Sequence, residues 1–215
     1  MLKDDPQPPK GGLKVYLSLA YLAPVEYYTA LAKAETVFLE NCDYYVKQTY
    51  RNRCNIAAAN GPMALSIPVE KSGAEKVLTH DIRISEHHDW QINHWRSIES
   101  AYNSTPFFEY YKDDLLPFYE KKWNFLWDFT TEIQSKIFEL LDIQPTVLLT
   151  KEYNETLDEN LLDLRESIHP KKANSLGKSK TYYQVFEQRF GFQPNLSIVD
   201  LLFNMGNEAV LILTT

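Results

Sequence analysis

The sequence is poor in glycine and cysteine, and this scarcity removes several familiar kinds of site. Its 7 glycines form neither a GxGxxG fingerprint nor a Walker A loop, so the chain offers no glycine-rich cradle for phosphates. Its two cysteines, Cys42 and Cys54, have neither CxxC nor zinc-finger spacing. We therefore expect no cofactor. Two lone thiols fit a reducing compartment, which predicts a cytoplasmic protein.

Positive charge and long apolar runs are also missing. The formal net charge is −7, which argues against nucleic acid or an anionic membrane as the main partner, because both attract a basic surface. No apolar run approaches the ~20 residues that a spanning helix needs, so no membrane span is expected. Residues 1–12 lack the apolar stretch of a signal peptide. They predict a short disordered lead before a single domain over residues 13–215.

The chain does contain enough apolar surface for a folded core. Hydrophobic residues make up 44% of it and aromatic residues 13%, including 14 tyrosines, which excludes a disordered chain. Tyrosine combines an apolar ring with a hydroxyl, and it suits cores with polar rims and ligand clefts.

The periodicity of the first residues predicts strands around one helix. Residues 13–22 form a β-rich apolar run, residues 25–34 have helical spacing, and residues 36–40 return to a strand pattern. A strand–helix–strand unit of this kind predicts a parallel pair of strands.

Two further β elements are expected before the helical part of the chain. Asn60-Gly61 is a strong turn dipeptide and predicts a hairpin between residues 53–59 and 63–69. Residues 78–85 alternate between apolar and polar side chains and predict a short strand.

The second half is predicted to be mostly helical. Helical spacing and capping residues define segments at 89–102, 105–119, 124–141, 182–189 and 198–205. A strand is expected at residues 146–149. The charged, turn-rich residues 153–180 predict a loop, with 154–180 as a lid. The expected fold class is α/β, with a mixed, partly parallel sheet, flanking helices and a mostly helical second half.

A cationic cluster follows the second predicted strand. It contains Lys47, Arg51, Asn52 and Arg53, with Asp43 nearby. Arginine presents a planar fork of donors that fits phosphate or carboxylate. Beside a cleft, this segment would bind an anion such as the diphosphate of a nucleotide sugar. The alternative is a solvated loop whose arginines pair with neighbouring carboxylates.

Histidines gather farther along, at His80, His87, His88 and His94. A zinc site favours two histidines four residues apart on one helix face, but His88 and His94 are six apart, so no metal site is expected. The free pKa of histidine lies near neutrality, which makes His94 a candidate general base. A half-buried structural histidine is the alternative. The neighbouring Trp95 is a candidate for stacking on a sugar ring.

The turns after the predicted strands supply the remaining candidates. Ligands of open α/β sheets bind beyond the carboxyl ends of the strands, which directs attention to Glu26, Tyr28 and Asp43. We expect Glu26 and Asp43 to act at the substrate by holding sugar hydroxyls, and Tyr28 to contribute to binding. Packing of the first helix on the sheet is the alternative for Tyr28.

Taken together, these blocks of sequence resemble the WbqC-like family. The resemblance is carried by YLAPVEYYTALAKAETVFLEN, YVKQTYRNRCNIAAANGPMALSIPVEK, DWQINHWRSIESAYNSTPFFEYY and the closing NLSIVDLLFNMG. It extends from about Leu13 to Gly206, nearly the whole chain. Many members have Gln-Pro where this chain has Ala20-Tyr21.

Members of that family often sit among genes for surface polysaccharide and O-antigen synthesis. The resemblance therefore implies sugar chemistry, such as transfer of an acyl or aminoacyl group to a nucleotide-linked amino sugar. The arginine block around Arg51 and the position of His94 match the family pattern, so the resemblance implies that they are candidate site residues.

Two hypotheses of different classes remain open. As an enzyme, the protein binds an activated anionic donor or a nucleotide sugar through Lys47, Arg51 and Arg53, with His94 as base. As a non-catalytic protein of a glycan-assembly complex, it binds a sugar or a partner and turns nothing over, and a homodimer burying residues 90–111 would fit that role. The enzyme hypothesis requires the cationic segment and His94 to meet in one pocket.

Overall fold

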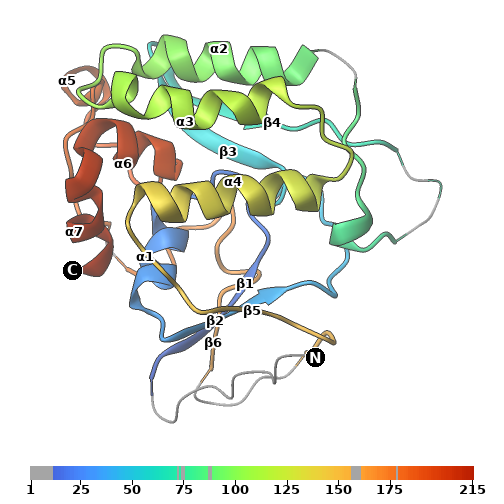
Figure 1. The fold of residues 1–215 in the computed structure, drawn as a ribbon. Helices are drawn as coiled ribbons and strands as arrows, with labels where there is room; N and C mark the ends of the chain where they lie inside the picture. The colour runs from blue at the N-terminus through green and yellow to red at the C-terminus, as the bar shows by residue number, and fades with distance from the viewer. Residues whose placement is uncertain (1–11, 72, 74–75, 87–88, 156–160, 178) are drawn as a thin grey trace.

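A parallel sheet forms one end of the molecule, and helices and a hairpin form the other (Figure 1). The computed structural model describes residues 12–71, 73, 76–86, 89–155, 161–177 and 179–215. The predicted lead of residues 1–12 lies outside these ranges except for Gly12. Within the described ranges, no helix has both the length and the apolar character needed to cross a bilayer.

The parallel sheet has the strand order β5-β2-β1-β6. β1 (Lys14–Ser18) pairs in parallel with β2 (Thr36–Glu40), and α1 (Val25–Lys33) connects them. β5 (Val147–Leu149) pairs with β2, and β6 (Leu161–Asp163) pairs with β1, again in parallel. The carboxyl ends of all these strands therefore lie along one edge of the sheet. This confirms the predicted strand–helix–strand unit and the α/β class.

Two details of the sheet differ from the prediction. β1 ends at Ser18 rather than Leu22, because the chain turns at Leu22, whose φ of 37° lies in the left-handed region. β6 lies within the segment that is predicted to be mostly loop. Its three residues, LLD, are too few to produce a periodic signal.

A hairpin is confirmed where it is predicted, but its turn is Ala59-Asn60 rather than Asn60-Gly61, and its second strand begins at Gly61. β3 (Arg53–Ala58) and β4 (Gly61–Ser66) pair antiparallel, with Ala57 opposite Pro62. The N–H of Ala57 donates to the hydroxyl of Tyr102, 3.0 Å away, rather than to β4. The pair is thus not hydrogen-bonded within the ladder, so Pro62 can lack its N–H without loss.

The strand predicted at residues 78–85 is wrong. This stretch contains the short 3-10 helix η1 (Thr79–Asp81) and then two isolated bridges, Ile84 to Val69 and Arg83 to Phe125. Ile82 and Ile84 are buried, so the alternation in the sequence correctly predicts that these two side chains face the core. The backbone, however, pairs with different segments at successive residues and builds no continuous ladder.

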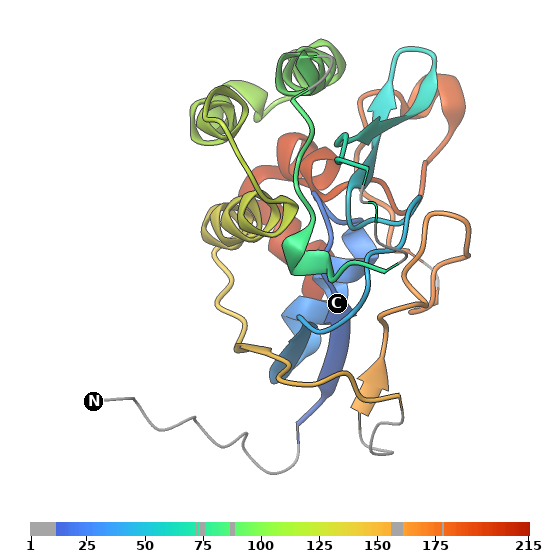
Figure 2. The ribbon, with the colours of Figure 1, turned by 90° about the vertical axis from the view of Figure 1, so that its right-hand side faces the viewer.

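Most of the remaining elements are helices, and Figure 2 shows the green to olive helices nearly end-on beside the hairpin. The predicted helices are confirmed, with small boundary shifts, at α2 (Trp90–Tyr102), α3 (Phe108–Glu120), α4 (Leu126–Leu140) and α6 (Ile198–Met205). The helix predicted at 182–189 is only the short α5 (Glu187–Phe190), and α7 (Ala209–Thr214) has no counterpart in the prediction. Pro117 lies inside α3, which continues to Glu120.

The core is rich in tyrosines whose hydroxyls find partners. Tyr27 and Tyr102 are almost fully buried. The hydroxyl of Tyr27 donates to the carbonyl of Ser18 at 3.1 Å, and that of Tyr102 accepts the N–H of Ala57. Burial of these rings removes apolar surface from water while the hydroxyls stay satisfied.

Candidate functional site

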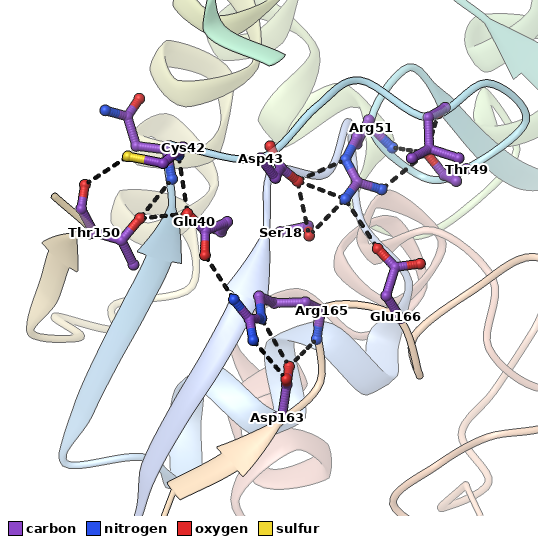
Figure 3. A network of polar contacts seen from close by, with 12 residues as sticks. Ser18, Glu40, Cys42, Asp43, Thr49, Arg51, Thr150, Asp163, Arg165 and Glu166 are labelled. Carbon is purple, nitrogen blue, oxygen red and sulfur yellow. Dashed lines mark hydrogen bonds and ion pairs between the residues drawn. The ribbon is translucent and has the colours of Figure 1, made fainter. Parts of the chain in front are cut away.

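A network of charged and hydroxyl side chains lies at the carboxyl edge of the parallel sheet (Figure 3). Ser18 ends β1 and Glu40 ends β2, while Arg165 and Glu166 follow β6. Open parallel sheets place their ligands at this edge. We call this group the carboxyl-edge network, and its members are Ser18, Glu40, Asp43, Thr49, Arg51, Thr150, Asp163, Arg165 and Glu166.

One half of the network is centred on Arg51. Its Nη2 lies 2.5 Å from Oδ2 of Asp43 and 2.9 Å from Oγ of Ser18, and its Nε donates to the same Asp43 oxygen at 3.1 Å. Nη1 donates to Thr49. Arg51 and Asp43 are both buried. Because a buried charge is costly unless it is paired, Asp43 holds the guanidinium in place.

The other half is centred on Arg165. Its guanidinium donates to Glu40 at 2.8 Å and to both carboxylate oxygens of Asp163. It also lies over the rings of Tyr16 and Tyr153, at 5.2 Å and 4.7 Å. Burial lowers the pKa of Arg165, but the hydrogen bonds to Asp163 and Glu40 outweigh burial and raise its pKa overall. Arg165 is therefore a fixed cation.

The two halves differ in how completely their carboxylates are satisfied. Glu40 accepts hydrogen bonds from Thr150 at 2.6 Å, from the N–H of Cys42 at 2.9 Å and from Arg165. Asp43 takes all its bonds on Oδ2, and among the described residues its buried Oδ1 has no hydrogen-bond partner. A buried acceptor without a donor is uncommon. The Glu40 half is thus complete, whereas the Asp43 half still has an oxygen that can accept a donor.

A narrow pocket opens next to Arg51. Its polar lining comes from Ser18, Thr49, Arg51, Arg165, Glu166 and His169. The cavity volume is about 10 Å³, roughly the room that one water molecule needs. Pockets that hold drug-sized ligands measure on the order of 300–1,000 Å³. The pocket as it stands is therefore too small for a sugar.

The predicted cationic segment is divided among different surroundings. Arg51 joins Asp43 in the network, as above. Asn52 donates to the carbonyl of Ile67 at 2.8 Å, and Arg53 donates to Ser66 at 3.1 Å, so both side chains are used along the hairpin. Lys47 is exposed. Of the four side chains, Arg51 alone lines the narrow pocket.

His94 lies on α2 and is enclosed by aromatic side chains. Its Nδ1 lies 3.0 Å from the hydroxyl of Tyr21, which in turn lies 2.8 Å from the hydroxyl of Tyr119, and the ring of Trp90 packs edge-on. Burial lowers the pKa of His94 to about 4, so the imidazole is neutral near pH 7. His94 does not line the pocket beside Arg51, and the structure does not bring the two together there.

The predicted binding aromatics pack inside the protein. Trp95 stacks on Phe108, with centroids 6.0 Å apart, and leans on Tyr119. Tyr28 is buried edge-on against Phe138, and burial raises its pKa well above the usual value. These contacts are those of core residues.

Glu26 holds a distant segment instead of facing the narrow pocket. Its Oε1 accepts the backbone N–H groups of Ser175 and of Leu176, the latter at 3.1 Å. Its Oε2 accepts the amide of Asn195 at 2.9 Å. The carboxylate is buried, so these donors replace its hydration. Glu26 thus fastens the loop after β6 to the start of α1.

The other histidines form no metal centre among the described residues. His80 bonds through Nδ1 to the carbonyl of Asn41 at 2.9 Å. His87 and His88 lie outside the described residues. No group of three or more His, Cys, Asp or Glu residues in the described ranges is placed to hold a metal ion.

The sequence analysis does not identify several residues of the network. Ser18 and Glu40 carry a usable signal, because a polar residue that ends an apolar strand lies at the ligand edge of a parallel sheet. Arg165 and Glu166 carry none, because their position depends on β6, which the pattern does not reveal.

Comparison with known proteins identifies a family to which the chain is similar. The family model described as the WbqC-like protein family matches residues 20–188. That range includes Asp43, Arg51, Arg165 and Glu166. A protein of Mycobacterium tuberculosis (strain ATCC 25618 / H37Rv), named Uncharacterized protein Rv1507c, is 25% identical over 207 residues, covering 85% of this chain and 89% of that protein. No solved structure matches significantly.

Proposed function

The chain belongs to the WbqC-like protein family, and from that premise we propose that it is a cytoplasmic enzyme of surface polysaccharide biosynthesis. Its reaction is the transfer of an acyl or aminoacyl group to a nucleotide-linked amino sugar. The site of binding is the narrow pocket at the carboxyl edge of the sheet, beside Arg51.

The observation that carries this proposal is the environment of Arg51. A buried guanidinium borders a pocket at the edge where parallel sheets bind ligands. Guanidinium groups bind phosphate and carboxylate groups. The Oδ1 atom of Asp43, which has no partner among the described residues, accepts a hydrogen from a hydroxyl or an ammonium group. A phosphorylated amino sugar offers both kinds of group.

In this proposal His94 has a positioning role. It holds the hydroxyl of Tyr21, and the backbone N–H of Tyr21 donates to the carbonyl of Tyr50 at 2.8 Å, immediately before Arg51. His94 therefore steadies the turn that carries Arg51. Its neutral, enclosed ring suits this role better than exchange of protons with a substrate.

Calorimetric titration with a panel of nucleotide-linked sugars and amino sugars tests the proposal. Arg51→Lys keeps the charge but loses the fork of donors, and we expect it to weaken binding about tenfold or more. Arg53→Lys is the matched control, because Arg53 contacts Ser66 on the hairpin, and its affinity should match that of the parent. The proposal fails if no member of the panel binds, or if both variants bind as well as the parent.

The second candidate is a non-catalytic sugar- or partner-binding protein of a glycan-assembly complex. The narrowness of the pocket and the enclosure of His94 favour it. Mass spectrometry of a sugar incubated with acyl and aminoacyl donors separates the two candidates, because only an enzyme forms the heavier product. A homodimer would support the binding role, and analytical ultracentrifugation detects it.

A further inference from the structure

Arg51 has two carboxylate partners that differ in exposure. The side chain of Asp43 is 6% exposed, whereas that of Glu166, whose Oε1 lies 3.2 Å from Nη2 of Arg51, is 60% exposed. The remaining partners, Ser18 and Thr49, are buried. Removing any buried partner would leave a polar group unsatisfied in the interior. Among the described residues, Glu166 is the one hydrogen-bond partner of Arg51 that can leave and be hydrated by water at little cost.

The segment that carries Glu166 is anchored at its two ends. We call residues 164–176 the covering segment. At its start, Leu164 and Ile168 are buried against the core. At its end, Glu26 accepts the N–H groups of Ser175 and Leu176. The middle of the covering segment can therefore shift while both ends stay attached.

The middle of the covering segment makes polar contacts at the surface. Lys171 donates to the side chain of Gln48 at 3.1 Å, and Lys172 donates to the backbone carbonyl of Glu166 at 2.6 Å. Both of these bonds are exposed, so water can replace them. His169 lines the narrow pocket, so movement of this part, together with a swing of the exposed Glu166 side chain away from Arg51, widens the pocket.

Cationic groups lie around the turn that carries Glu166. Arg51 lies on the inner side, and Lys171 and Lys172 follow in the covering segment. Burial lowers the pKa of His169, and the charges of Lys172, Lys171 and Arg51 lower it further, while Glu166 raises it. The charges of these side chains thus all reach His169, and Glu166 is the acidic member of this basic group.

We propose that the Glu166 carboxylate holds the place on Arg51 that an anionic group of the substrate takes, so that a phosphate or carboxylate must displace it to bind. This inference rests on the proposed function of the Arg51 pocket and names the gating residue. Displacement keeps the Asp43–Arg51 pair intact. It replaces the ion pair between Arg51 and Glu166 with an ion pair between Arg51 and the anion of the ligand, and it opens the covering segment. Glu166 thereby selects for ligands that carry an anion.

The test compares Glu166→Gln with Glu139→Gln. Both remove one negative charge from an exposed side chain, and Glu139 lies on α4, where it pairs with Lys136. Inorganic pyrophosphate and malonate serve as the phosphate and carboxylate probes in low-salt calorimetry. We expect Glu166→Gln to bind one probe roughly fivefold more tightly than the parent, and Glu139→Gln to match the parent. The gain should shrink at high salt, because exposed charges are screened.

Each outcome has a distinct meaning. Tightening for pyrophosphate or for malonate supports the inference and identifies the anion as phosphate or carboxylate. Equal or weaker probe binding by Glu166→Gln overturns the inference, and so does equal tightening in Glu139→Gln. If neither probe binds while a nucleotide sugar binds through Arg51, the inference alone fails. If nothing in either set binds the parent, the proposed function fails as well.

Limited trypsin digestion gives a second measurement that needs no ligand. Lys171 and Lys172 are exposed, but trypsin needs an extended backbone around the cleaved bond, which this segment of turns adopts when it opens. We expect Glu166→Gln to be cut there several times faster than the parent, with the sites identified by mass spectrometry. Unchanged rates at these lysines would show that Glu166 does not hold the segment closed.

Discussion

The guanidinium of Arg165 lies 2.8 Å from the carboxylate of Glu40 and links the end of β6 to the end of β2 across β1. Both side chains are almost fully buried. This pair closes the half of the carboxyl-edge network that has no unsatisfied carboxylate oxygen. We therefore regard the Glu40–Arg165 pair as the structural part of the network, beside which the Arg51 half lies.

Removing Glu40 should destabilise the fold strongly. Glu40→Ala leaves the Arg165 guanidinium with one carboxylate fewer in the interior, which costs about 3–5 kcal/mol. Urea unfolding monitored by tryptophan fluorescence measures the loss. Glu139→Ala removes an exposed carboxylate from α4 and should change stability by less than about 0.5 kcal/mol. A loss for Glu40→Ala no larger than that of the control would contradict the assignment.

Much of this edge follows from the sequence. The apolar runs of β1 and β2 are buried, so their pattern is strong, and the parallel pairing then fixes where Asp43 and Arg51 lie. β6 has only three residues, with two of them exposed, and such a strand is held by its neighbours rather than by its own pattern. The positions of Arg165 and Glu166 are consequently a result of tertiary structure.

A pattern in the sequence predicts the burial of His94. His94 is spaced by one turn from Ile98 and by two from Ala101, and all three side chains are buried on α2. A histidine on the apolar stripe of a helix faces the core. The residue type suggests a general base, whereas the position on the apolar face of the helix predicts a ring enclosed in the core. For the surroundings of His94, the position is the better predictor.

His94 should make the protein less stable in acid. Burial lowers its pKa from 6.5 to about 4, so the unfolded chain binds the proton more readily than the folded one. The stabilisation is complete above pH 6.5 and is lost as the pH falls towards 4, by roughly 3 kcal/mol. Urea unfolding between pH 4 and 8 measures this contribution as the difference in pH dependence between the parent and His94→Gln, which lacks it. An identical slope in His94→Gln would contradict the prediction.

Asp200 on α6 should have the opposite effect. Burial raises its pKa from 3.8 to about 6, despite hydrogen bonds from Tyr182 at 2.7 Å and from Gln184 and Tyr102. The folded state therefore binds the proton more tightly, and stability is lost as the pH rises from about 4 through 6, by roughly 3 kcal/mol. Asp200→Asn mimics the protonated form.

The two effects overlap between about pH 4 and 6, so the variants are needed to separate them. In Asp200→Asn the opposing slope is absent, and the acid destabilisation due to His94 should appear at full size. In His94→Gln the loss of stability with rising pH due to Asp200 should remain. If Asp200→Asn has the same pH dependence as the parent, Asp200 does not titrate in this range.

Glu26 should control the order of the outer end of the covering segment. Its carboxylate accepts the N–H groups of Ser175 and Leu176 and the amide of Asn195. Glu26→Ala removes both acceptor oxygens and leaves these partly buried donors without their partner, at a cost of about 1–3 kcal/mol. Hydrogen exchange of the Ser175 and Leu176 amides should then become about tenfold faster or more, since 1.4 kcal/mol corresponds to a factor of ten. Glu35→Ala, in the loop after α1, is the control and should leave both amides unchanged. Retained protection in Glu26→Ala would mean that packing of Leu164 and Ile168 alone holds the covering segment in place.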